Sequence, residues 1–196
     1  MNRRDALMRV AALMGTTLTL PALANTLEAS AARRALSGKP LLFSADQDTM
    51  VAEMTEVIIP TTSTPGAKAA KVNEIIDIIL KDCYPQKDQK QFLDGLAHTN
   101  ELSQAAYSKN FVALDATQRT EIMTKLQAEA AEQRKAMASM PAEKRYTPFF
   151  NTLKSLTLNG YFTSEIGATQ ALAYIAVPGR FQGCVDLKPG QKAWAT

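Results

Sequence analysis

The sequence predicts a mainly α-helical protein: a single compact domain of about five helices with an irregular C-terminal tail rich in aromatic residues and glycine. Apolar residues recur at intervals of three and four along most of the chain after residue 44, as they do on the buried face of a helix. No segment before Gly160 shows the sustained two-residue alternation of a strand. A length of 196 residues, of which 46% are apolar, is typical of one domain with its own core.

Residues 1–24 have the composition of a cleaved export signal, and we exclude them from the fold. A basic start precedes an apolar stretch that is too short to span a membrane comfortably, and an A-x-A cleavage site follows. The adjacent arginines resemble the bacterial twin-arginine signal, which exports folded proteins, although Ala6 stands where that signal usually has Phe. The alternative is an ordinary secretory signal. The signal residues are Arg3, Arg4 and Leu7, and the cleavage residues are Ala22 and Ala24.

Residues 25–43 are rich in Ala, Ser and small polar residues, and we expect them to form a linker or arm. The helical domain then covers residues 44–196, and residues 160–196 form its docking tail. Without the signal the chain is close to neutral, and its basic residues are scattered. Such a charge distribution provides no electrostatic footprint for nucleic acid or for an anionic membrane surface.

Five helices are expected in the domain, over residues 46–59, 72–84, 86–107, 115–140 and 149–160. Ser44 or Asp46 can cap the first helix, and a proline ends it. Pro65 and Gly66, within residues 61–67, then favour a fixed loop. Asp115 and Gln118 form a variant of the capping box at the start of the fourth helix.

The C-terminal part differs from the helical body in composition. Residues 146–196 contain 8 of the 13 aromatic residues and 5 of the 9 glycines. Aromatic anchors among small residues are typical of large protein interfaces. The alternative is that these aromatic residues pack against the chain's own helices. Residues 172–177 are expected to form a short strand.

The residue types of this chain argue against cofactor chemistry within it. One His and two Cys residues exclude the common zinc sites, because those sites need several nitrogen or sulfur ligands at one ion. The chain also lacks the glycine-rich phosphate-binding motifs, the haem-attachment motif and the hydrolase nucleophile motif. We interpret His98 as a partly exposed helix residue, because a lone general base needs a nucleophile and an orienting carboxylate.

The remaining polar and sulfur-containing candidates receive structural interpretations. Three acidic pairs have the spacing of solvated helix faces: Glu53 with Glu56, Asp77 with Asp82, and Glu129 with Glu132. Methionines at helical spacing are expected in the core: Met50, Met54, Met123, Met137 and Met140. For Cys83 and Cys184, an exported chain permits a disulfide, but two buried free thiols, or a bond from one of them to a partner, stay open.

Short blocks along the domain carry a family resemblance. They cover residues 58–60, 64–67, 159–168, 177–181, 183–184 and 190–194, together with Tyr174. Together with the arginine pair, these blocks resemble the small (gamma) subunit family of gluconate 2-dehydrogenase, from about Asp46 onward.

The resemblance implies a non-catalytic small subunit of a periplasmic, membrane-associated sugar or sugar-acid dehydrogenase. In such complexes a large flavoprotein of the glucose-methanol-choline type holds FAD, and a multihaem cytochrome c subunit often accepts the electrons. The small subunit carries the export signal for the flavoprotein through the twin-arginine translocase. The resemblance thus implies no cofactor bound by this chain, no activity from it alone, and membrane association only through partners.

We expect the docking tail to contact the flavoprotein through a set of aromatic, small and charged residues. These are Gly160, Tyr161, Phe162, Thr163, Ser164, Glu165, Gly167, Pro178, Gly179, Arg180, Phe181 and Trp194. Two other classes stay open. An independent enzyme would have to use His98 and scattered acids, and a stand-alone periplasmic helical binding or interaction protein would need no partner.

Overall fold

The computed structural model describes residues 40–141, 143, 145–177, 179–180, 183–184, 186–187 and 189–195. The export signal, with Arg3, Arg4, Leu7, Ala22 and Ala24, lies outside the described residues. The same holds for most of the expected linker and for Pro178 and Phe181 of the docking tail.

The described part of the chain is mainly α-helical, with five α-helices, which confirms the predicted fold class. The α-helices are α3 (Ala45–Ile58), α4 (Val72–Cys83), α5 (Gln86–Tyr107), α6 (Ala116–Ala138) and α7 (Phe149–Thr163). A 3₁₀ turn, η1 (Phe111–Ala113), precedes α6, and a π-helical turn, η3 (Gly167–Ala171), follows α7.

Local capping signals account for the starts of two helices. The hydroxyl of Ser44 accepts the backbone N–H of Gln47, and the Gln47 side chain accepts the backbone N–H of Ser44 in return. Asp115 and Gln118 make the same reciprocal pair at the start of α6, as predicted. Each box satisfies two backbone donors that have no partner within the helix.

Two local predictions near the C-terminus were wrong. α7 continues past Gly160 to Thr163, because this glycine lets α4 approach closely rather than ending the helix. A Cβ added at Gly160 would lie 3.1 Å from Val72 Cγ1. The expected strand over residues 172–177 is also absent from the described residues, where Ala173 forms a single isolated bridge with Trp194.

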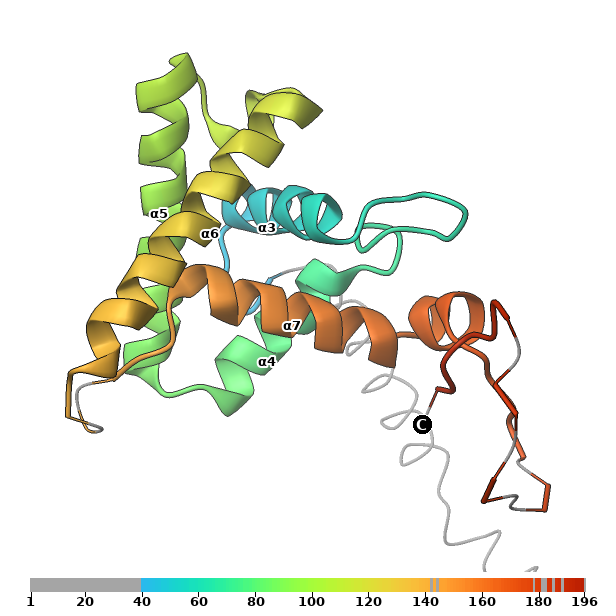
Figure 1. Ribbon diagram of the computed structural model, residues 1–196. Coiled ribbons are helices and arrows are strands. Elements are labelled where there is room, and N and C mark those ends of the chain that lie inside the picture. The colour runs from blue at the N-terminus through green and yellow to red at the C-terminus, as the bar shows by residue number, and fades with distance from the viewer. Residues whose placement is uncertain are drawn as a thin grey trace, which may run out of the picture. The chain divides into compact units, whose positions relative to one another are not determined.

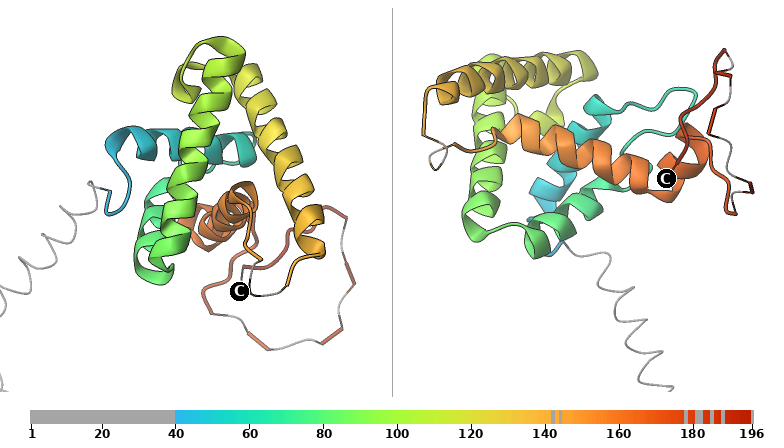
Figure 2. Two further views of the ribbon diagram at one scale, coloured as in Figure 1. Left: turned by 90° about the vertical axis from the view of Figure 1, so that its left-hand side faces the viewer. Right: turned by 60° about the horizontal axis from the view of Figure 1, so that its bottom comes forward.

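Helix α7 occupies the centre of the helical domain and packs against α3, α4, α5 and α6. Figures 1 and 2 show these helices around it, and the left view of Figure 2 looks along its axis. The chain after α7 leaves the end of that helix that lies away from α5 (Figure 1). One face of α7 therefore belongs to the core, while its other face and its C-terminal extension remain at the surface.

The core draws apolar side chains from all five α-helices. Among the predicted core methionines, four are buried: Met50, Met54, Met123 and Met137. Met140 lies beyond the end of α6 and is 38% exposed, so the prediction was wrong for this residue. Phe92 makes aromatic contacts with Phe43 and Phe149, at ring-centroid distances of 5.8 and 5.0 Å.

Asp77 corrects the interpretation of the acidic pairs as solvated. Its side chain is almost fully buried, at 3% exposure, and its carboxylate accepts the backbone N–H groups of Leu41, Leu42 and Phe43. These bonds hold the chain that enters α3, and Phe43 joins the core. A buried carboxylate is tolerated here because backbone donors satisfy it.

Glu53 is likewise part of a packed ion-pair cluster rather than a solvated face. Its side chain is 14% exposed, and its two carboxylate oxygens lie 2.5 Å from Lys68 Nζ and 2.5 Å from Arg119 Nη1. Burial acts to raise the pKa of this carboxyl, but the hydrogen bond from Lys68 and the charges of Arg119 and Lys68 outweigh it. The pKa of Glu53 is therefore lowered from its usual value.

The third correction concerns Glu56, which organises the loop after α3. Its carboxylate accepts the backbone N–H groups of Thr61 and Lys68, at 2.8 and 2.9 Å, and the Thr61 hydroxyl. A Cβ at Gly66 would lie 2.4 Å from the Glu56 oxygens, so only glycine leaves room for them. The fixed loop predicted over residues 61–67 is confirmed.

Candidate docking surface

The chain turns sharply after α7, and two predicted interface residues produce this turn. The Ser164 hydroxyl donates to the backbone carbonyl of Tyr161 at 2.6 Å and accepts the backbone N–H of Gly167 at 3.0 Å. A Cβ at Gly167 would lie 1.8 Å from the Tyr161 carbonyl oxygen, so no larger residue fits. Ser164 and Gly167 therefore set the direction in which the chain leaves α7.

A backbone bridge closes the base of the segment that follows. The N–H of Ala173 donates to the carbonyl of Ala193 at 2.8 Å, and the N–H of Ala195 donates to the carbonyl of Ala173 at 2.8 Å. The ammonium of Lys192 adds a bond to the carbonyl of Gln170. The bonds thus hold residue 173 beside residues 193–195, so the chain between them, which we call the tail loop, leaves and returns at one place.

This C-terminal segment exposes several large apolar side chains, which we call the tail surface. Its members are Phe162, Tyr174, Ile175, Val177, Leu187 and Trp194. Val177 and Leu187 are the most exposed, at 82% and 83%. Burying a Val or Leu side chain completely contributes roughly 1.5–3 kcal/mol relative to leaving it in water, so a partner that covers these residues gains binding free energy.

The structure divides the predicted interface residues into two groups. Gly160, Tyr161 and Gly167 are buried in the chain's own fold, and Ser164 is half-buried. The exposed members are Phe162, Thr163, Glu165, Gly179, Arg180 and Trp194. Tyr161 is only 2% exposed, and its hydroxyl donates to the carbonyl of Pro65 at 2.7 Å. Its role in the described fold is thus to hold the loop before α4 against α7.

Four members of the tail surface were missed by the sequence-based site prediction: Tyr174, Ile175, Val177 and Leu187. The sequence contained a signal for their exposure, because they are apolar residues in a segment without helical periodicity. Such residues cannot all turn inward on one helix face.

The two cysteines are both exposed free thiols in the structure. The interpretation of Cys83 and Cys184 as two buried thiols is therefore wrong. No bond joins them in the structure, and Cys184 lies within the tail loop.

His98 links two helices at the surface, in agreement with its interpretation as a partly exposed helix residue. Its side chain is 47% exposed, with Nε2 2.9 Å from Glu129 Oε2 on α6 and Nδ1 3.7 Å from Glu101 Oε2 on α5. Both ring nitrogens thus face carboxylates. Within the described residues, no group of three or more His, Cys, Asp or Glu side chains could hold a metal ion.

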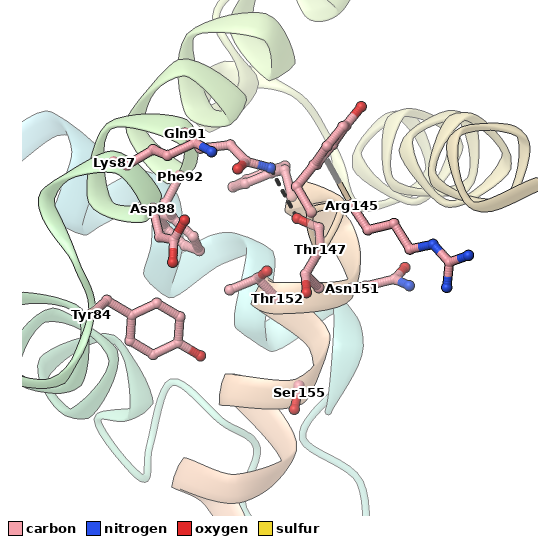
Figure 3. Close-up of a pocket in the computed structure, with 12 residues that line it drawn as sticks. Tyr84, Lys87, Asp88, Gln91, Phe92, Arg145, Thr147, Asn151, Thr152 and Ser155 are labelled. Carbon is pink, nitrogen blue, oxygen red and sulfur yellow. Dashed lines mark hydrogen bonds between the residues drawn. The ribbon is translucent and has the colours of Figure 1, made fainter. Parts of the chain in front are cut away.

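Hollows between the helices flank the N-terminal half of α7, and one of them, lined by Asp94, His98 and Glu129, lies between α5, α6 and the start of α7. The hollow between α5 and α7 has a volume of about 380 Å³, and Figure 3 shows Tyr84 and Asp88 facing Thr152 across it. The Gln91 amide donates to the Thr147 carbonyl at its rim, at 2.9 Å. The hollow between α6 and α7 has a volume of about 400 Å³. Asn151 and Ser155 line both hollows.

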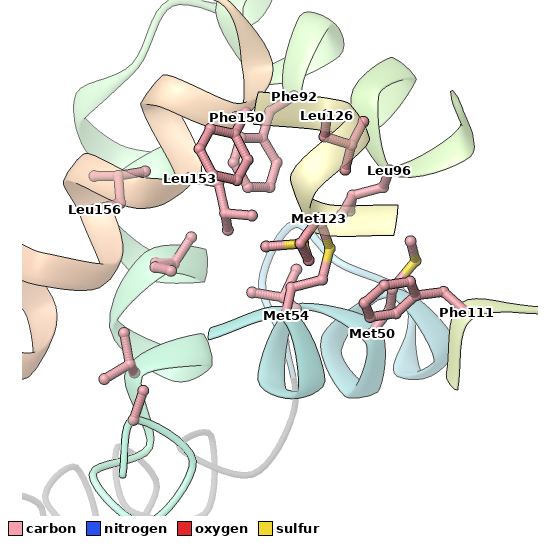
Figure 4. Close-up of a cluster of buried hydrophobic side chains, with 14 of the residues drawn as sticks. Met50, Met54, Phe92, Leu96, Phe111, Met123, Leu126, Phe150, Leu153 and Leu156 are labelled. Atoms are coloured by element: carbon pink, nitrogen blue, oxygen red, sulfur yellow. The ribbon is translucent and has the colours of Figure 1, made fainter. Parts of the chain in front are cut away.

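The inner face of α7 is committed to the core. Phe150, Leu153 and Leu156 point from α7 towards the apolar cluster that contains Phe92 and Met54 (Figure 4). The spacing of three between these α7 residues keeps them on one side of the helix. The outer side, with Ser155, Leu158 and Phe162, is left for other contacts.

Comparison with known proteins adds a family to this geometry. No curated protein and no solved structure was found to match the chain. In the described residues, no helix is both long and apolar enough to cross a membrane. The family described as gluconate 2-dehydrogenase subunit 3 matches residues 45–179, from the first residue of α3 into the tail loop. This match covers more than half of the chain, which therefore belongs to the gluconate 2-dehydrogenase subunit 3 family.

Proposed function

We propose that this chain is the non-catalytic small subunit of a periplasmic, membrane-associated sugar or sugar-acid dehydrogenase, and that it helps its catalytic subunit to fold, assemble and be exported. The observation that carries the proposal is the family match over residues 45–179. Membership of this family implies association with other gluconate dehydrogenase subunits. In the proposed complex, a glucose-methanol-choline-type flavoprotein holds FAD, a cytochrome subunit holds haem c, and this chain supplies binding surface.

The tail surface supports a role in assembly. Val177 and Leu187 project from a loop whose base is closed by the Ala173 bridge. A loop with a fixed base loses less conformational freedom on binding than a free tail, so more of its burial energy remains for association. Large exposed apolar residues on a soluble domain are typical of an interaction site.

Export is proposed from the sequence of the first 24 residues. The twin-arginine pathway carries folded proteins, and a flavoprotein without its own signal would need a folded partner that has one. The small subunit would then bind the flavoprotein before translocation. Assembly and export are thereby coupled through one interface.

The test is co-expression of this chain with the flavoprotein subunit of the same dehydrogenase, followed by tag purification from the periplasm. The purified material is assayed for bound FAD and for dye-linked sugar dehydrogenase activity. We expect an active yellow complex with the natural chain and none in the periplasm with Arg3→Lys/Arg4→Lys. If this chain reaches the periplasm alone and retains no flavoprotein, the stand-alone binding protein becomes the better explanation.

A matched pair of variants tests the tail surface itself. Val177→Ser/Leu187→Ser removes two apolar side chains from the tail, whereas Ile78→Ser/Val112→Ser removes two exposed ones from α4 and η1. We expect only the tail variant to lose the flavoprotein on purification. Equal retention by both variants would contradict docking through the tail.

A further inference from the structure

We propose that the two hollows beside α7 form a cationic groove that binds an acidic segment of the catalytic subunit. This inference rests on the proposed function and adds a second contact to the tail surface. By cationic groove we mean the α5–α7 hollow, the α6–α7 hollow and the face of α7 between them, where Asn151 and Ser155 line both hollows.

The groove is positively charged, although the chain without its signal is nearly neutral. Lys87 and Arg145 line the α5–α7 hollow, and Arg134 and Lys154 line the α6–α7 hollow. Among the lining residues of the two hollows, Asp88 is the one acidic residue. The neighbouring hollow between α5, α6 and the start of α7 contains Asp94 and Glu129, which lie within ion-pair distance of Lys90 and His98. The excess of cations favours a partner of opposite charge.

These cations are not neutralised by carboxylates within the described residues. Lys87, Arg134 and Lys154 form no ion pair there, and Arg145 donates to the carbonyl of Met140 at 3.0 Å instead. Four other lysines are paired, Lys68 with Glu53, Lys71 with Glu74, Lys90 with Asp94, and Lys135 with Glu132, whereas Lys81, Lys109 and Lys125 also have no ion pair in the described residues. A carboxylate that enters the groove therefore has no internal ion pair to displace.

The groove also contains an apolar contact point that continues towards the tail surface. Leu158 lines the α6–α7 hollow and is 37% exposed. Phe162, a member of the tail surface, follows four residues later and is 40% exposed, so both lie on one side of α7. One partner can thus cover the groove and the tail surface together.

The arrangement of the charges indicates a protein segment rather than a small anion. The four cations come from α5, α6, α7 and the chain before α7, and they are distributed over two hollows on either side of an exposed helix face. A small anion needs donors that converge on one point. A segment with several Asp or Glu side chains and one apolar anchor can instead cross α7 and reach both hollows.

The test compares two double variants with the same change in net charge. Arg134→Glu/Lys154→Glu reverses the charges of the α6–α7 hollow. The control, Lys109→Glu/Lys125→Glu, alters cations that line neither hollow. Lys125 is on α6, but residues two positions apart do not share a helix face, so it lies on a different face from Gln127, which lines the α6–α7 hollow. Association of each purified chain with the FAD-loaded catalytic subunit is measured by biolayer interferometry at low and high salt.

We expect the groove variant to lower the association rate constant at low salt by about tenfold or more, because steering by complementary charge raises on-rates by roughly 10–1,000-fold. High salt should abolish most of the difference between the groove variant and the natural chain. The control variant should stay within about twofold of the natural chain, because its substituted residues line neither hollow. Arg134→Gln/Lys154→Gln, compared with Lys109→Gln/Lys125→Gln, provides the same matched test should the glutamate variant fail to fold.

Equal rates for the groove and control variants would overturn the cationic groove while leaving the proposed function intact. If the natural chain forms no complex with the catalytic subunit, both the groove proposal and the proposed function are overturned. Anionic phosphatidylglycerol vesicles form the last arm: if the groove variant loses binding to vesicles but keeps its association rate with the catalytic subunit, the groove binds membrane lipid and the acidic-segment proposal is wrong.

Discussion

Tyr161 and Phe162 are neighbours at the end of α7, and their roles should separate cleanly on substitution. Tyr161 is 2% exposed and donates its hydroxyl hydrogen to the Pro65 carbonyl, whereas Phe162 is 40% exposed. Their rings contact each other edge to face, with centroids 5.2 Å apart. We therefore expect Tyr161 to contribute to folding stability and Phe162 to contribute to docking.

The magnitudes follow from these contacts. Tyr161→Phe removes one hydrogen bond and should lower the free energy of unfolding by about 1 kcal/mol. In a domain of this size, that loss lowers Tm by roughly 2–4 °C. Tyr161→Ala also opens a cavity and should cost about 3–5 kcal/mol. Phe162→Ala loses mainly the aromatic pair, worth about 0.5–1.5 kcal/mol.

Urea denaturation followed by circular dichroism gives the stabilities, and co-purification with the catalytic subunit gives docking. We expect Tyr161→Phe to bind like the natural chain and Phe162→Ala to bind more weakly. The reasoning is refuted if Phe162→Ala destabilises the domain as much as Tyr161→Ala. It is also refuted if Tyr161→Phe leaves Tm unchanged but abolishes docking.

Two further predictions concern Asp77, which is buried, and Glu53, which is half-buried. Asp77→Asn replaces an acceptor of three backbone N–H groups by a side chain that has only one acceptor oxygen. Losing charge-assisted hydrogen bonds should cost about 3 kcal/mol, measured by urea denaturation against the exposed control Asp82→Asn. Glu53 has a lowered pKa in the fold, so its stabilisation is complete above the unfolded value near 4.5 and is lost as pH falls through the folded pKa. The stability difference between the natural chain and Glu53→Gln should therefore shrink as pH falls from neutral to below 4.5, and a constant difference would contradict the ion-pair explanation.

The helices could be predicted because their signals are local. The three- and four-residue spacing of apolar side chains marks one helix face, and α5 begins and ends at the predicted residues, Gln86 and Tyr107. The capping boxes at Ser44 and Asp115 each lie within four residues. The predicted end of α7 was wrong because Gly160 owes its place to contact with α4, which is distant in sequence.

The docking tail stays a prediction for a segment, and the sequence did not resolve it to individual side chains. Composition singled out the C-terminal part as a docking tail, and the exposed apolar side chains of the described tail are consistent with that role. Which residues face a partner could not be deduced, because Tyr161 and Phe162 differ little in sequence context. The cationic groove also escaped detection, since its lining residues come from α5, α6, α7 and the chain before α7.

The sequence by itself determined the helical class, the order of the helices and the resemblance to a family, because periodicity, caps and short motifs are properties of neighbouring residues. Only the tertiary structure decided which polar residues are buried and which aromatic residues remain at the surface. Asp77 binds a segment 34 to 36 positions away, and Tyr161 binds Pro65 across 96 positions. Whether a residue is buried depends on such distant segments coming together, so the spacing of neighbouring residues cannot predict burial.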